Sequence, residues 1–187
     1  MASDQMRRMQ VAWKEAYAGP DGSNGSTRPP VEWIPPPRNT IKCNVDAAVS
    51  GNGASFGIVV RDHDGRFVAA KCGRLVGEED PYMAEVLGAK EALAWLKMQH
   101  HSNIILESDC LNFCNAFNSC ISDHSCVGLV VKQCLSIAKD IGNVSVSHVK
   151  RSANRVAREL ARATVSMSVS GVWTGIPPSC IASLLSQ

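Results

Sequence analysis

The chain has 187 residues, of which 45% are hydrophobic and 19% are charged, and its formal net charge is +2. These values are typical of one globular domain with tails, and the near-neutral charge excludes a broadly basic surface. The sequence has no signal-peptide pattern, no apolar stretch of membrane length and no C-x-x-C pair, which argues against secretion, a membrane partner and a structural zinc site. We therefore expect a soluble intracellular protein with reduced cysteines.

Residues 1–39 differ from the rest of the chain in their content of glycine, serine and proline. The segment PDGSNGSTRPPVEWIPPPRNT contains three consecutive prolines, which neither a helix nor a central strand accommodates. We predict a flexible N-terminal segment over residues 1–39, with Trp33 as the best candidate to anchor it. The main domain is expected over residues 40–166, and residues 167–187 are expected to form a C-terminal strap that ends in a short helix.

The first half of the domain has the alternating pattern of β-strands. Apolar and polar residues alternate over residues 41–49, which places Asn44 and Asp46 on the same face of the predicted strand. The strand-like residues 54–61 and 66–72 flank a turn, which predicts an antiparallel hairpin. Three antiparallel strands are therefore expected to open the domain.

The second half of the domain alternates helices with short apolar strands. Pro81 suits the first turn of a helix, and the alanine, leucine and glutamate residues that follow favour one. The resulting order, βββαβααβα, predicts an α/β fold with a five-stranded mixed sheet and helices on both faces. The expected elements are a helix over residues 81–99, a strand over 103–108, helices over 110–118 and 126–141, a strand over 144–149 and a helix over 152–166.

Three acidic residues occupy positions where apolar residues are expected. Asp46 lies in the first strand, Glu85 on the apolar stripe of the first helix, and Asp109 directly after a short strand. Burial of a polar group without a partner costs about 2–7 kcal/mol, so the three carboxylates are expected to converge on a shared divalent cation, as in phosphodiester hydrolysis. Each acid also has a structural explanation, because an aspartate after a strand can cap a helix, an acid near a helix start interacts with the helix dipole, and buried acids can form ion pairs.

Five segments, KCNVDAA, GIVVRDHDGRFV, MAEVLGAKEAL, ILESD and HVKRSANRVARELAR, resemble the type 1 ribonuclease H family and, within it, the plant retroelement-derived, reverse-transcriptase-associated branch. The resemblance covers residues 41–166 and implies the ribonuclease H-like fold. It also implies metal-dependent endonucleolytic hydrolysis of the RNA strand of RNA–DNA hybrids, with Mg²⁺ or Mn²⁺ held by Asp46, Glu85 and Asp109. A 3′–5′ exonuclease of related fold would carry a second acid where Ala48 stands.

The same resemblance assigns roles to further residues. His148 corresponds to a catalytic histidine that helps to activate water or to release product, and the alternative is a core histidine. Asn154 corresponds to an asparagine before the last helix, where helix capping is the alternative. Asn44, Asn154, Arg151 and Arg155 are expected to contact the RNA–DNA hybrid or another nucleic acid, and the chain is expected to act as a monomer.

Arg158 departs from the family pattern, since it stands where the family often has a fourth metal-binding aspartate. A guanidinium group stays charged and cannot bind a cation. The alternative function is therefore a catalytically weakened or inactive nucleic-acid-binding domain of the same fold. Arg151, Arg155, Arg158 and Arg162 also recur at helical spacing, which predicts a stripe opposite the apolar face, either as a solvated surface or as a row of phosphate contacts.

Overall fold

The computed structural model describes residues 31–51, 53–119, 123–167 and 170–185. The flexibility predicted for residues 1–39 falls mainly on residues 1–30, which lie outside the described part of the chain. Across the described residues, none of the helices combines the length and the apolarity needed to cross a membrane.

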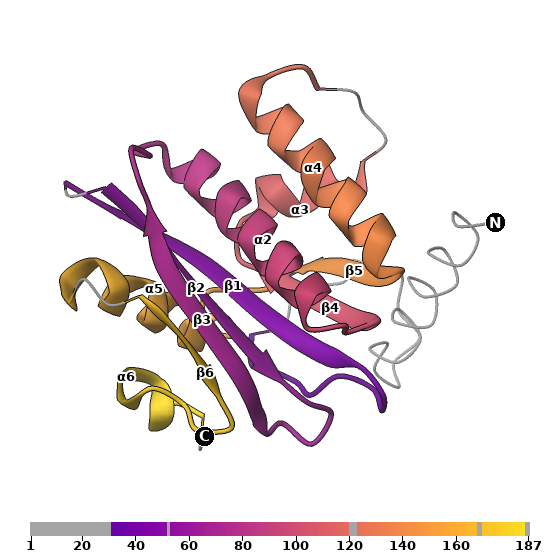
Figure 1. Cartoon of the computed structure of the whole chain (residues 1–187), viewed down its shortest axis with the longest axis vertical. Helices are drawn as coiled ribbons and strands as arrows, with labels where there is room; N and C mark the ends of the chain where they lie inside the picture. Colours follow the sequence, from indigo (N-terminus) through magenta and orange to yellow (C-terminus); the bar gives the residue numbers. More distant parts are fainter. Residues whose placement is uncertain (1–30, 52, 120–122, 168–169, 186–187) are drawn as a thin grey trace.

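A six-stranded mixed sheet forms the centre of the fold, in the order β5-β4-β1-β2-β3-β6 (Figure 1). Its strands are β1 (Ile41–Ser50), β2 (Gly53–Arg61), β3 (Phe67–Leu75), β4 (Asn103–Ser108), β5 (Asn143–His148) and β6 (Gly171–Thr174). β1, β2, β3 and β6 pair antiparallel, whereas β4 runs parallel to both β1 and β5. The predicted mixed sheet is confirmed, but it has six strands rather than five.

The C-terminal strap contributes the additional strand. β6 pairs antiparallel with β3 from Cys72 opposite Gly171 to Ala69 opposite Thr174. Without β6, the outer edge of β3 would leave its backbone N–H and C=O groups unpaired. A strand of four residues contains too little alternation for recognition in the sequence, so only its pairing with β3 identifies it.

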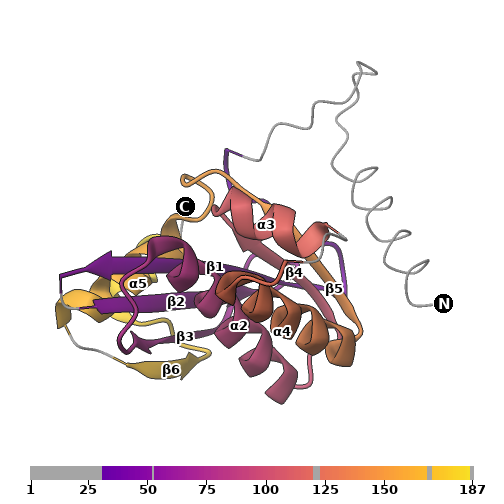
Figure 2. The same ribbon diagram turned by 90° about the horizontal axis from the view of Figure 1, so that it is seen from above.

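Helices cover both faces of the sheet, as predicted. α2, α3 and α4 lie on one face, and α5 and α6 lie on the other (Figures 1 and 2). Residues 151–154 form turns, so the last long helix begins three residues later than predicted. The helices are α2 (Pro81–Met98), α3 (Leu111–Asn118), α4 (Cys126–Ile141), α5 (Arg155–Met167) and α6 (Ser179–Ala182).

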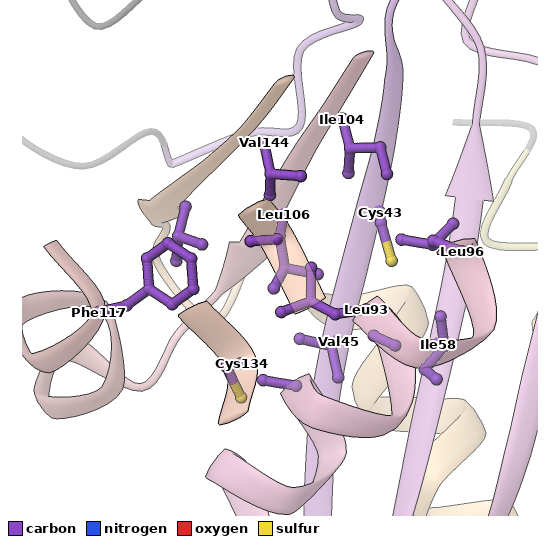
Figure 3. Close-up of a cluster of buried hydrophobic side chains, with 14 of the residues drawn as sticks. Cys43, Val45, Ile58, Leu93, Leu96, Ile104, Leu106, Phe117, Cys134 and Val144 are labelled. Atoms are coloured by element: carbon purple, nitrogen blue, oxygen red, sulfur yellow. The ribbon is translucent and has the colours of Figure 1, made fainter. Parts of the chain in front are cut away.

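The larger hydrophobic core fills the space between the sheet and α2, α3 and α4 (Figure 3). β1 contributes Cys43 and Val45 to this core, and α2 contributes Leu93 and Leu96, all of them fully buried. The alternate side chains of β1 therefore point to the opposite face, toward α5. That face is buried as well, although on β1 it carries polar residues.

Gly57 lies where the backbone of α5 packs directly against the sheet. A Cβ atom at Gly57 would lie 2.4 Å from the carbonyl oxygen of Ala157 and 2.5 Å from the backbone nitrogen of Ala161. Because backbone atoms cannot swing aside, we expect Gly57→Ala to lower the free energy of unfolding by about 2–3 kcal/mol in urea titrations. Gly51→Ala is the control, since a Cβ atom at Gly51 meets nothing within 4 Å. Equal stability of the two variants would contradict this account of the packing.

Candidate functional site

Three carboxyl groups from different parts of the chain meet at the middle of β1, beside the end of β4. Asp46 lies in β1, Glu85 in α2, and Asp109 directly after β4. One oxygen from each carboxyl group lies within 4.8 Å of the others. The convergence expected from the sequence is therefore observed.

The parallel pairing of β1 with β4 brings two of these acids together. Cys43 lies opposite Leu106 and Asn44 lies opposite Glu107, so the same register carried two residues further places Asp46 beside Asp109. β4 ends at Ser108 while β1 continues to Ser50. The edge of β1 is therefore open where these two side chains lie, and ligands of open α/β sheets bind at such strand ends.

Glu85 approaches from the other face of the sheet. The predicted stripe of Ala89, Ala92 and Leu96 packs α2 against the sheet, and each of these residues is fully buried. This packing holds Glu85 over β1, where its carboxylate accepts a hydrogen bond from the backbone of Ala47.

The structure supports neither helix capping by Asp109 nor a helix-dipole role for Glu85. The residue that caps α3 is Cys110, and the side chain of Asp109 takes no part in capping. The first turn of α2 contains no acidic residue, so Glu85 lies beyond the region where the helix dipole acts most strongly. Neither capping nor the helix dipole therefore explains why these acids are present.

Asn154 forms hydrogen bonds with both Asp46 and Asp109. Its Nδ2 donates to Oδ1 of Asp46 at 3.3 Å, to Oδ1 of Asp109 at 3.2 Å and to the carbonyl oxygen of Val45 at 2.9 Å. Its Oδ1 accepts from Nδ2 of Asn44 at 3.2 Å. Asn154 is 1% exposed and Asn44 is 0% exposed. Asn154 therefore positions the two aspartates, Asn44 supports Asn154, and neither side chain presents a surface to a ligand.

A buried ion pair that was not predicted from the sequence lies next to Asn44. Nζ of Lys42 lies 2.7 Å from Oε1 of Glu107, and both side chains are at most 3% exposed. Nδ2 of Asn44 donates to Oε2 of Glu107 at 2.9 Å, and Nη2 of Arg61 donates to Oδ1 of Asn44 at 2.9 Å. The alternation of β1 could have indicated that Lys42 is buried, because Lys42 shares the face that carries Asn44 and Asp46.

Trp33 covers this polar cluster, which agrees with its predicted role as an anchor. Its ring centroid lies 3.5 Å from Cζ of Arg61 and 5.4 Å from Nζ of Lys42. Lys42 also donates to the carbonyl oxygen of Ile34 at 2.6 Å, and Ser152 donates to the carbonyl oxygen of Val31. Residues 31–34 therefore dock against the start of β1 and against the turn that precedes α5.

The three acids open into a small hollow with a basic wall. Its volume is about 170 Å³, and its other lining residues are Ala47, Arg151, Arg158 and Arg162. Nε of Arg151 lies 3.5 Å from Oδ2 of Asp109. The hollow thus brings carboxylates and guanidinium groups together.

The predicted arginine stripe is wrong in two respects. Arg151 precedes α5 and lies in a turn. Arg158 does not face solvent opposite the apolar side, since it is half-buried and its Nε is buried in the wall of the hollow. Arg155 is exposed and lies outside the set of residues that line the hollow. Helical spacing alone does not distinguish Arg158 from Arg155, because the packing angle of α5 decides which residues turn inward.

His148 ends β5, opposite Ser108 in the parallel ladder. It is half-buried and is not among the residues that line the hollow. Its catalytic role therefore remains a prediction from the family resemblance.

Burial and mutual repulsion change the acidity of the cluster. Burial raises the pKa of Asp46 to about 9, with further contributions from Glu85 and Asp109, while the charge of Arg158 acts in the opposite direction. Burial and the charge of Asp109 raise the pKa of Glu85 to about 8. A cation among these groups would offset both effects, because an opposite charge favours the ionised carboxylate.

The residues present fit a hard divalent cation. All three side chains offer carboxylate oxygen, which is the donor that Mg²⁺ and Mn²⁺ prefer. Oε2 of Glu85 is buried and has no hydrogen-bond partner among the described residues, so it retains the capacity to bind such an ion.

The raised pKa values predict how the stability of the metal-free protein depends on pH. Folding raises the pKa of Asp46 from 3.8 and that of Glu85 from 4.5, so their protonated forms stabilise the fold. This stabilisation is complete below pH 4 and is lost as the pH rises through about 8 and 9. In EDTA, we expect the free energy of unfolding to fall between pH 5 and pH 9, and to fall less steeply in Asp46→Asn. If urea titrations give the same pH dependence for the unchanged protein and for Asp46→Asn, the raised pKa of Asp46 is not responsible.

Comparison with known sequences finds matches over most of the chain. The reverse transcriptase-like family matches residues 44–164. A putative ribonuclease H protein of Arabidopsis thaliana is 30% identical over 172 residues, which cover 87% of this chain and 27% of the relative. The chain thus spans about a quarter of the length of that curated relative.

Comparison with solved structures supports the fold. The ribonuclease H1 of the halophilic archaeon Halobacterium salinarum matches with a TM-score of 0.63 and 21% identity, over 68% of this chain and 98% of that one. LC11-RNase H1, solved in complex with an RNA/DNA hybrid, matches with a TM-score of 0.61 and 18% identity, over 70% of this chain and all (100%) of that one. The ribonuclease H-like fold expected from the sequence is confirmed, and the chain belongs to the reverse transcriptase-like family.

Proposed function

We propose that this chain hydrolyses the RNA strand of RNA–DNA hybrids by metal-dependent endonucleolytic cleavage. The observation that carries the proposal is the convergence of Asp46, Glu85 and Asp109 within 4.8 Å at the end of a parallel strand. The name of the Arabidopsis relative and the hybrid bound to LC11-RNase H1 support the substrate class. The finer family assignment, to the plant retroelement-derived branch of type 1 enzymes, rests on the five sequence segments and is part of the same proposal.

The three acids would hold Mg²⁺, or Mn²⁺ in its place. When bound, the cation supplies positive charge at the scissile phosphate and lowers the pKa of a water molecule. Asn154 keeps the carboxyl groups of Asp46 and Asp109 in a fixed relation through its two hydrogen bonds. The packing of α2 holds Glu85 opposite them. These contacts preorganise the acids before a ligand binds, which reduces the cost of assembling the site.

Basic residues beside the hollow would contact the backbone of the hybrid. Arg151 is 82% exposed and Arg162 is 62% exposed in their side chains, and Arg155 is exposed one turn before Arg158 on α5. Contacts of this kind bind phosphate without reading sequence and weaken as salt rises. We further propose that the chain acts on the hybrid as a monomer, with residues 40–166 as the active domain.

A cleavage assay tests the proposal directly. The purified chain is incubated with Mg²⁺ and an RNA strand labelled at its 5′ end and paired with complementary DNA. We expect fragments from internal cuts in the RNA, no fragments in EDTA, and no cuts in the same RNA as a single strand or in double-stranded DNA. Intact RNA at excess protein would overturn the proposal, and a gel shift with the intact hybrid would then favour the inactive nucleic-acid-binding domain.

A further inference from the structure

We propose that the hollow takes a single divalent cation, and that the guanidinium group of Arg158 provides the second positive charge at the bound phosphate. This inference rests on the proposed function and concerns which positive charges contact the phosphate at the same site. It follows from the balance of charges in the wall of the hollow and from the burial of Arg158. It also follows from the ion pairs that the neighbouring arginines form with acids, whereas Arg158 forms none among the described residues.

The charges that line the hollow limit how many cations it accepts. Asp46, Glu85 and Asp109 supply three negative charges when ionised, and Arg151, Arg158 and Arg162 supply three positive charges. One divalent cation leaves a net charge of +2, which two phosphate groups of a nucleic acid backbone would match. A second divalent cation would leave +4 in about 170 Å³, beside a guanidinium group that cannot lose its proton.

Arg158 differs from the other two arginines of the hollow in its surroundings. Arg151 is held to Asp109 and Arg162 to Glu159, and the side chains of both arginines are largely exposed. Arg158 is half-buried, and within the described part of the chain its Nε has no hydrogen-bond partner and no acid lies within ion-pair distance. Burial of an unpartnered N–H group is unfavourable, so this position favours a ligand that accepts a hydrogen bond there.

A phosphate oxygen is the acceptor that best fits Arg158. A guanidinium group carries five N–H donors in a plane, with no acceptor, and pairs closely with the oxygens of phosphate. Arg158 lines the same hollow as the three acids. A phosphate group between the cation and Arg158 would therefore contact positive charge on both sides.

Manganese binding tests the number of cations without reference to activity. Isothermal titration with Mn²⁺ is carried out on the full chain and on the Arg158→Asp, Arg158→Gln and Arg66→Asp variants. Arg66→Asp is the matched control, because Arg66 is 76% exposed in the turn after β2 and carries the same charge change away from the hollow. Circular dichroism verifies that each variant is folded.

We expect one Mn²⁺ per chain in the unchanged protein and in Arg66→Asp. Arg158→Gln should bind one ion roughly tenfold more tightly, because a repelling charge is removed. Arg158→Asp should bind a second ion. Two ions in the unchanged protein, or Arg158 variants that match Arg66→Asp, would overturn the inference and leave the proposed function intact. No Mn²⁺ binding at all would overturn the proposed function itself.

The salt dependence of hybrid binding tests the contact with phosphate. Affinity is measured in EDTA, which prevents cleavage, over a range of salt concentrations. Loss of one phosphate contact should reduce the slope of log affinity against log salt by about 0.9 in Arg158→Gln. An unchanged slope would overturn the role assigned to Arg158 at the phosphate.

Discussion

Replacement of Asp46 by asparagine is expected to reduce Mg²⁺-dependent cleavage of the hybrid by about a thousandfold or more, which corresponds to about 4 kcal/mol in the activation free energy. Asp46 is 3% exposed and lies where β1 passes the end of β4, within reach of both other acids. Asparagine keeps the size of the side chain and removes the charge. The variant should therefore stay folded and lose cation binding.

Single-turnover rates measured on the labelled hybrid check this expectation, with Mn²⁺ titration as an independent readout. Asp64→Asn provides the control, because Asp64 lies half exposed in the turn after β2 and forms an ion pair there with Arg66. That variant should cleave at the rate of the unchanged protein. If Asp46→Asn cleaves as fast as Asp64→Asn, the three acids do not form the catalytic centre.

Glu107→Gln is expected to cause the largest loss of stability, about 3–5 kcal/mol, because it breaks a buried ion pair from one side. Glu107 is 2% exposed and its carboxylate lies 2.7 Å from Nζ of Lys42. The charge of Glu107 also supports the protonated form of Arg61, whose pKa is lowered to about 10 by burial. The substitution therefore removes the negative charge of Glu107 that lies close to the buried cations Lys42 and Arg61.

Urea titrations of Glu107→Gln and of Asp140→Asn provide the comparison. Asp140 pairs with Lys97 at the same distance of 2.7 Å, but the two side chains are 52% and 49% exposed. Exposed pairs contribute about 0–1 kcal/mol because water screens them. A loss in Glu107→Gln no greater than that in Asp140→Asn would show that burial adds nothing to this pair.

Hydrogen bonds around the buried ion pair also connect Trp33 to the acids. Trp33 lies over Arg61, Arg61 donates to Asn44, and Asn44 donates to both Glu107 and Asn154. Asn154 in turn donates to Asp46 and Asp109. Glu107→Gln should therefore also weaken Mn²⁺ binding, although Glu107 does not line the hollow.

The sequence by itself determined the order of the elements from β1 to α5 and the identity of the three acids. Alternation of apolar residues identifies β1, and the spacing of Ala89, Ala92 and Leu96 identifies the buried side of α2. Both signals are local, since a strand repeats every two residues and a helix about every 3.6. An acid that interrupts such a pattern is visible without knowledge of its neighbours in space.

Only the tertiary structure decided what those acids contact. The register of β1 against β4 places Asp46 beside Asp109, and it also places Asn44 beside Glu107. The packing angle of α5 turns Arg158 into the hollow and leaves Arg155 in solvent. Pairing across a sheet and the angle between a helix and a sheet depend on contacts between residues far apart in the chain. For that reason local periodicity does not reveal the partner of Lys42, the pairing of β6 with β3 or the direction of Arg158.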